Sequence, residues 1–128
     1  MFLTARGGGC CRMRDMICRI WHGRTPRSKA VAYTSFLVKR AIPDYRSVEG
    51  NIDVEILRWD DGDVTHFLTV THWDSEEVIR AFAGDDLLKA KYYPEDRDFL
   101  LEFEPNVQHY LVYERTGIPP SAIGTLRS

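Results

Sequence analysis

Apolar and polar residues alternate with a period of two along four segments of the chain, a pattern typical of β-strands. The four segments are residues 16–22, 48–59, 64–73 and 107–113. The second and third are joined by Asp60-Asp61-Gly62-Asp63, where the Asp-Gly step supplies the positive φ angles of a tight hairpin. In residues 16–22 both alternating faces carry apolar side chains, so we expect this strand to lie inside the sheet.

A helix is predicted for residues 26–40, after the first strand. Thr25 is a suitable N-cap, and Pro26 suits the first helical position. Apolar residues then recur every three or four positions. Pro43 disfavours helical geometry at the residue before it, so we expect the helix to end there.

A second, shorter helix is predicted after the third strand. Asp74 and Glu77 form a capping-box pattern, and Gly84 marks the expected end of the helix. Short helical turns are expected in residues 85–93 and 95–101. The run 95–98, Glu-Asp-Arg-Asp, is read as a solvated turn, with a lid over a substrate site as the alternative.

The order strand, helix, strand, strand, helix, strand predicts an α+β fold of the ferredoxin-like βαββαβ kind. Right-handed crossovers then give a four-stranded antiparallel sheet in the order 4-1-3-2. Its helices can cover only one face, yet the strands carry apolar residues on both faces. We therefore expect the second face to pair with another copy of the chain in a homodimer.

A chain of 128 residues with 44% hydrophobic content can bury one core but hardly two. Residues 16–115 are predicted to form that domain. Residues 1–15 have no apolar periodicity and are expected to be a disordered tail, while residues 116–128, rich in Gly and Pro, are expected to be irregular.

Charge and cysteine content narrow the class of protein. The 17 basic and 19 acidic residues give a net charge of −2, which disfavours a nucleic-acid partner. No apolar run is long enough to span a membrane, and no secretion signal is evident. Three cysteines, two of them adjacent, give neither a disulfide framework nor zinc-ligand spacing. We expect a cytoplasmic protein with reduced thiols.

Three segments carry a resemblance to a known family: MICRIWHGRTPRSKAVAY, THFLTVTHWDSEEVIRAF and DDLLKAKYYPEDRDFLLEFEP. Over about residues 16–114 the chain resembles the antibiotic biosynthesis monooxygenase family of dimeric α/β barrels. The resemblance implies two ferredoxin-like units packed sheet against sheet. It also implies oxygenation of aromatic compounds by O₂ without metal or flavin, or, in another branch, binding and degradation of haem.

The haem-degrading branch fits this chain poorly. That branch uses an asparagine in the first strand, and a tryptophan separated by nine residues from an iron-binding histidine. The first strand here has no asparagine, and the resemblance places Phe82 and Tyr92 at the other two positions. Tyrosine ligates haem iron in some proteins, so haem is disfavoured and not excluded. We expect no cofactor.

A cofactor-independent oxygenase needs a dry aromatic pocket and polar groups that deprotonate the substrate and stabilise developing charge. The candidate catalytic residues are Arg19, His22, Trp73 and Tyr92, and the candidate pocket residues are Trp21, Tyr33, Phe82 and Tyr93. Aromatic residues in a small domain usually serve packing, which is the alternative for each of them. Arg19 lies inside a strand and needs a partner, for which Asp53 or Glu55 is a candidate.

Three histidines are predicted to share one end of the sheet. In the antiparallel order 4-1-3-2, the end of the first strand lies beside the beginnings of the third and fourth, where His22, His66 and His109 occur. Because each alternates with apolar residues, the three imidazoles could share a face and bind a metal or act as acid and base. Separate hydrogen bonds are the alternative. His72 lies too far along its strand to join them.

Two classes of function therefore remain. One is a small monooxygenase acting on an aromatic or otherwise hydrophobic small molecule. The other is a non-catalytic, dimeric ligand-binding or stress-related domain of the same fold. A closed core without a pocket between sheet and helices would favour the second. Motifs of hydrolases and nucleotide-binding proteins do not occur in the sequence.

Overall fold

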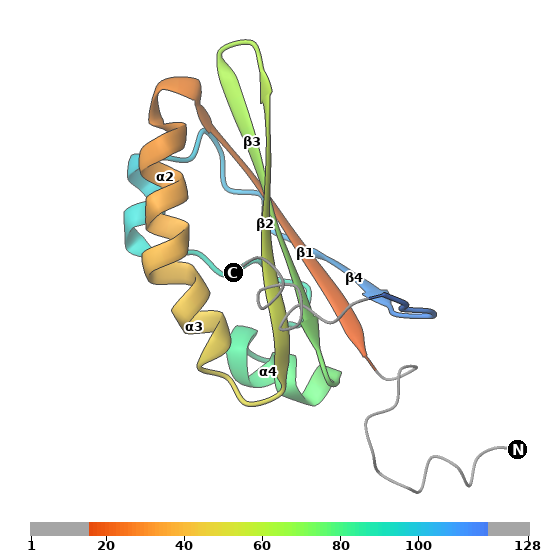
Figure 1. Cartoon of the computed structure of the whole chain (residues 1–128). Helices are drawn as coiled ribbons and strands as arrows, with labels where there is room; N and C mark the ends of the chain where they lie inside the picture. Colours follow the sequence, from red (N-terminus) through yellow and green to blue (C-terminus); the bar gives the residue numbers. More distant parts are fainter. Residues whose placement is uncertain (1–15, 118–128) are drawn as a thin grey trace, which may run out of the picture.

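The computed structural model describes residues 16–117, which form a sheet covered on one face by helical segments (Figure 1). The strands are β1 (Ile17–Pro26), β2 (Asn51–Asp61), β3 (Val64–Trp73) and β4 (Gln108–Leu111). Their order is β2-β3-β1-β4, and every neighbouring pair is antiparallel. The predicted ferredoxin-like sheet, with the first strand inside it, is confirmed. The predicted tail 1–15 and residues 118–128 lie outside the described residues.

The β2–β3 hairpin turns at Gly62, which has a φ of +63° as the Asp-Gly step predicts. β3 has the predicted bounds. β2 begins at Asn51, three residues later than expected, because Gly50 adopts a φ of +99° just before the strand. A Cβ at Gly50 would lie 2.6 Å from a methyl carbon of Val78, so the turn also needs glycine for space.

The first helical region continues past the predicted end at Pro43. It consists of η2 (Arg27–Lys29), α2 (Ala30–Phe36), the π-helical η3 (Leu37–Ala41) and α3 (Ile42–Arg46). The Ile42 N–H donates to the carbonyl of Leu37, five residues earlier, just before Pro43 enters the first turn of α3. Backbone N–H groups in the first turn of an α-helix have no partner within the helix, so a proline, which has no N–H, is tolerated there. The π-helical segment ends just before α3 and thereby places Pro43 in such a first turn. The predicted end was wrong.

The second helix, α4 (Glu76–Ala83), is capped one residue later than the sequence pattern predicted. The hydroxyl of Ser75, not the carboxylate of Asp74, accepts the N–H of Val78. Gly84, with a φ of +95°, ends the helix as predicted. Residues 85–93 contain no helix, and η4 (Pro94–Asp98) is a short 3₁₀ turn.

The core lies between the sheet and the helical layer. Trp73, Phe67, Tyr33 and Ile79 are among its fully buried side chains. Burial alternates strictly along β1 and β3, so one face of each central strand is buried while the other, the open face, is half-buried. In the described part of the chain, no helix is long and apolar enough to cross a membrane.

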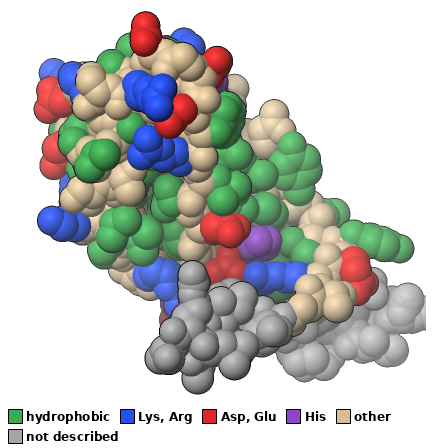
Figure 2. All heavy atoms as spheres, turned by 45° about the horizontal axis from the view of Figure 1, so that its top comes forward, with side chains coloured by type: hydrophobic (Ala, Val, Ile, Leu, Met, Phe, Trp, Pro, Cys, Tyr) green, Lys and Arg blue, Asp and Glu red, His purple; other side chains and the backbone are tan. Residues whose placement is uncertain are grey.

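The open face of the sheet exposes large apolar side chains. Trp59 on β2 is 46% exposed and Tyr110 on β4 is 51% exposed. Figure 2 shows hydrophobic side chains along the sheet side of the molecule, while charged side chains gather over the helical layer. The helices therefore leave an apolar surface uncovered on the sheet.

Candidate functional site

A small cavity of about 10 Å³ lies between the helical layer and the buried face of the sheet. It is lined by Trp21, Tyr33, Leu37, Ala41, Tyr45, Thr69, Lys91, Tyr93 and Asp96. Three of these, Trp21, Tyr33 and Tyr93, are pocket residues that the sequence predicted. A space of this volume holds one water-sized molecule and no aromatic ring.

The buried carboxyl group of Asp96 is the most unusual polar group of this core cavity. Asp96 is only 2% exposed, although its charged neighbours in η4 suggested a solvated turn. Its Oδ1 accepts the Tyr33 hydroxyl at 2.8 Å, and its Oδ2 accepts the Tyr93 N–H at 2.7 Å. Burial raises the pKa of Asp96 in spite of these two hydrogen bonds. A carboxyl group in this setting can serve as a general base.

The carboxylate of Asp44 fastens the irregular segment beside the cavity to α3. Its Oδ2 accepts hydrogen bonds from the Tyr93 hydroxyl and, at 3.0 Å, from the Lys91 ammonium. Although burial opposes it, these bonds hold the pKa of Asp44 below its usual value. The Lys91 ammonium also lies 4.2 Å from the ring centroid of Phe82. Two hydrogen bonds to one carboxylate thus close this side of the cavity.

Trp21 places its indole N–H close to Tyr92. Its side chain is buried, and no acceptor meets its Nε1 in ideal hydrogen-bond geometry within residues 16–117, although the N–H is near enough to the Tyr92 hydroxyl to oppose the rise in the pKa of that group. The ring of Tyr92 meets the indole edge to face with centroids 6.2 Å apart, but the Tyr92 hydroxyl donates to the carbonyl of Glu104. Burial raises the pKa of Tyr92 to about 12.

Trp73 and Phe82 belong to the packed core and do not line the cavity. The Trp73 indole is fully buried and donates to the Thr71 hydroxyl at 2.8 Å. The rings of Trp73 and Phe82 lie 5.3 Å apart, and Tyr45 stacks on Phe82 at 4.8 Å. Both side chains therefore have the packing role that the sequence analysis gave as the alternative.

Arg19 is buried on the helix-covered face and bonded to backbone carbonyls. Its guanidinium donates to the carbonyls of Leu87 at 2.6 Å and Lys89 at 3.0 Å. The expected partners Asp53 and Glu55 were wrong, because Asp53 pairs with His72 and Glu55 with Val70, on the opposite face. Desolvation lowers the pKa of Arg19. Arg19 thus holds the irregular segment after α4 onto the sheet.

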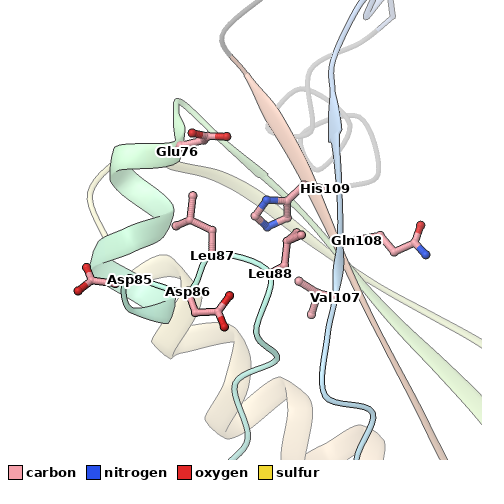
Figure 3. Close-up of a pocket in the computed structure, with 8 residues that line it drawn as sticks. All are labelled: Glu76, Asp85, Asp86, Leu87, Leu88, Val107, Gln108 and His109. Atoms are coloured by element: carbon pink, nitrogen blue, oxygen red, sulfur yellow. The ribbon is translucent and has the colours of Figure 1, made fainter.

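A larger groove of about 730 Å³ lies beside Arg19, between α4, the segment after it and β4 (Figure 3). His109 projects into it, whereas Gln108 points to the other side of β4. The Arg19 guanidinium lies 3.0 Å from Nε2 of His109. Because a guanidinium only donates, Nε2 must accept, and the hydrogen of the neutral imidazole sits on Nδ1. Burial and the Arg19 charge lower the pKa of His109.

The predicted convergence of three histidines was wrong for His109. Nε2 of His22 and Nδ1 of His66 lie 2.9 Å apart on the open face. His109 pairs with Arg19 in the sheet and therefore lies on the covered face. Apolar residues occupy both faces of these strands, so alternation with them does not reveal the face. Among residues 16–117, no group of three or more potential ligands is arranged to hold a metal ion.

The family model described as antibiotic biosynthesis monooxygenase matches residues 25–90 of the chain. A search of curated proteins finds no match. Among solved structures, a putative antibiotic biosynthesis monooxygenase from Nitrosomonas europaea is similar, with 18% identity over 80% of this chain and 95% of that one and a TM-score of 0.59.

Two further solved structures share the fold and have different activities in their descriptions. A haem-degrading protein from Mycobacterium tuberculosis has 19% identity over 80% of this chain and 99% of its own, with a TM-score of 0.55. SnoaB, a cofactor-independent oxygenase from Streptomyces nogalater, has 16% identity over 82% and 98%, with a TM-score of 0.52. At these identities the likeness shows the fold alone.

Proposed function

The chain belongs to the antibiotic biosynthesis monooxygenase family, and on that premise we propose that it oxygenates a small aromatic or otherwise hydrophobic molecule with O₂, without metal or flavin. The observation that carries the proposal is the Asp96 carboxyl group, buried with a raised pKa on the wall of an aromatic cavity. A base of raised pKa is suited to removing a proton from a phenol or from an activated carbon.

The proposed reaction balances without an external reductant. Asp96 takes a proton from the substrate, and the resulting anion supplies electrons to O₂. A C–O bond forms, the O–O bond breaks, and the second oxygen leaves as water, so that a CH₂ group and O₂ become C=O and H₂O. The proton held by Asp96 returns to that water. The substrate therefore provides all four electrons that O₂ accepts.

Substrate entry requires the core cavity to open. A space of about 10 Å³ is too small for an aromatic ring, so residues 91–96 must move away from α3. The hydrogen bonds of Lys91 and Tyr93 to Asp44 are the contacts that such a movement breaks. This segment contains only a short 3₁₀ turn, which makes it the part of the cavity wall most able to move.

Haem does not fit these residues. The Tyr92 hydroxyl donates to the Glu104 carbonyl, and burial raises the pKa of Tyr92 to about 12. Since iron is bound by the phenolate and not by the phenol, Tyr92 is a poor ligand for iron. Phe82, at the position that the resemblance gives to a tryptophan, is packed against Tyr45 in the core. We therefore derive no step through haem.

Oxygen uptake tests the proposal. The full chain is incubated with a panel of dihydroxyaromatic compounds under air and under anaerobic conditions, and O₂ consumption and products are followed. Asp96→Asn should lower the rate by about 100-fold or more, the scale of a lost general base. Glu95→Gln is the matched control, because Glu95 is the neighbouring acidic residue and is half-exposed. Its ion pair with Arg40, at 4.0 Å, is long. Equal rates for both variants would refute the role of Asp96.

A second candidate function is a non-catalytic ligand-binding or stress-related domain. It is favoured by one observation, the closed core with its cavity of only about 10 Å³. In that case the wild-type chain would consume no O₂ with any member of the panel.

We also propose that two copies of the chain pair through the open face. The proposal is supported by the apolar side chains of Leu57, Trp59 and Tyr110, which are more than one third exposed on a surface that no helix covers. A single chain rarely leaves a large apolar patch in water.

A further inference from the structure

We propose that the groove between α4, the segment after it and β4 is a second binding site, which takes a small organic cation with an apolar body, such as a hydrophobic amine. The groove shares no lining residue with the core cavity, and the inference goes beyond the proposed function because it involves no reaction with O₂. Its volume of about 730 Å³ is that of a small-molecule site (Figure 3).

The apolar part of the groove lining consists of Leu87, Leu88 and Val107. Val107 is buried, whereas Leu88 is 47% exposed. An apolar ligand body that covered these side chains would remove hydrocarbon surface from water and so favour binding. The backbone beneath them is held in place, because the Val107 N–H donates to the carbonyl of Leu88 at 2.8 Å and Arg19 donates to that of Leu87. The apolar wall is therefore formed before a ligand binds.

The charged side chains of the groove lining are all negative. Glu76 lies in the first turn of α4, and Asp85 and Asp86 follow its C-terminal end. Within residues 16–117 none of the three forms an ion pair. The last carbonyl groups of a helix carry partial negative charge, which opposes two carboxylates placed just after them. Arg80, in the last turn of α4, does not line the groove. A cation at this end of the groove would relieve the repulsion.

His109 adds no positive charge to the groove. Arg19 donates to its Nε2, so the imidazole is neutral, with its hydrogen on Nδ1. Arg19 itself is only 2% exposed and lies behind the lining, and Glu76 opposes the effect of its charge on His109. Asp85 and Asp86 lie on the α4 side of the groove, whereas His109 lies on β4 (Figure 3). The ammonium group therefore belongs beside the two aspartates, with the apolar body extending toward β4.

An organic cation fits the groove better than a metal ion or an anion does. Among residues 16–117 no three potential ligands are arranged to hold a metal ion. A metal ion would also leave Leu87 and Leu88 uncovered, whereas an amine brings an apolar body of its own. Fatty acids and other hydrophobic anions could cover the leucines, but the three carboxylates repel them.

Titrations of the full chain with four probes test the site. Phenethylamine has the charge and the apolar body, phenethyl alcohol has the body alone, ethylamine has the charge with little apolar surface, and phenylacetate has the opposite charge. Binding is followed at low ionic strength by ¹³C NMR of the leucine methyl groups. We expect phenethylamine to shift Leu87 and Leu88 and to bind about tenfold more tightly than each of the other three probes. Absence of these shifts with phenethylamine would overturn the proposal.

The contribution of the carboxylates is tested by a double variant, Asp85→Asn with Asp86→Asn. It should raise the dissociation constant of phenethylamine about tenfold, to that of phenethyl alcohol, and leave that of the alcohol unchanged. Asp63→Asn is the matched control, because Asp63 is exposed in the hairpin between β2 and β3 and does not line the groove.

Two results would overturn the site. One is an affinity for phenethylamine that equals that for phenethyl alcohol or survives the double variant unchanged. The other is a set of shifts confined to Tyr33 and Tyr93, which would place the amine in the core cavity. Because no O₂ uptake enters these measurements, failure of the proposed function would leave their outcome unaffected.

Discussion

Nε2 of His22 and Nδ1 of His66 share a hydrogen bond of 2.9 Å on the open face of the sheet. Nδ1 of His22 is 2.6 Å from a carboxylate oxygen of Glu104, and the ring of His66 lies parallel to that of Trp59 at 4.4 Å. Because a carboxylate can only accept, His22 donates to Glu104 and receives the hydrogen of His66. The pair thus lies on the surface proposed to meet a second copy.

Trp59→Asp should dissociate the proposed dimer without unfolding the chain. Trp59 is 46% exposed on the open face, so a charge there is tolerated in the monomer but would be buried between two copies. Val31→Asp is the matched control, since Val31 is 76% exposed on the helical layer. Sedimentation velocity should give a monomer for the first variant and a dimer for the second. A wild-type chain that is monomeric at micromolar concentration would defeat the pairing itself.

Gly23→Ala should destabilise the fold through its clash with Trp21. The new Cβ would lie 2.3 Å from the indole, and overpacking of this kind costs about 1–3 kcal/mol. The clashing atoms belong to the six-membered ring of the indole, so the same change should cost less in a Trp21→Phe background. Urea denaturation of the four proteins in this cycle measures the coupling. Equal costs in both backgrounds would show that the space next to Gly23 is not set by Trp21.

Asp96→Asn should become more stable relative to the wild type as pH rises. The folded-state pKa of Asp96 is raised, so its contribution to stability is fully present below the unfolded value of about 3.9 and is lost as pH rises through the folded value. Each unit of difference corresponds to about 1.4 kcal/mol. Asp44 and Asp53, whose pKa values are lowered, act in the opposite sense but equally in both proteins.

The measurement is the difference in unfolding free energy between the two proteins at pH 4 and pH 8, from urea denaturation. A difference that stays constant over this range would mean that Asp96 titrates normally in the folded chain. It would also remove the main support for Asp96 as a base.

The order of the strands and the bounds of β3 could be predicted because patterns within short segments of the sequence mark each strand and the hairpin. A period of two defines each strand, and the Asp-Gly step at Gly62 fixes the hairpin register. The continuation of the helix through Pro43 could not be predicted in this way. It depends on a switch to π-helical hydrogen bonds in residues 37–41, for which these residues carry no distinctive pattern.

One third of the residues that line the core cavity could be predicted from the sequence, but the acidic group among them could not. Trp21, Tyr33 and Tyr93 were selected as aromatic residues near expected elements. Asp96 was missed because it stands in a run of charges, and its partner Tyr33 is 63 positions away in the sequence. The face of the sheet on which His109 lies could not be predicted either, because it depends on the register of β4 against β1, in which His109 pairs with Arg19.

The π turn in η3 also sets the rotational phase of the helical layer. Tyr33 and Tyr45 are both buried against the sheet, yet twelve residues of regular α-helix, at about 100° each, would turn one about 120° away from the other. A π turn absorbs one extra residue, and eleven steps leave only about 20° between the two rings. Deleting a single residue from η3 would therefore let a regular α-helix run through this region with the same phase, and Tyr45 would keep its contacts to Trp73 and Thr69.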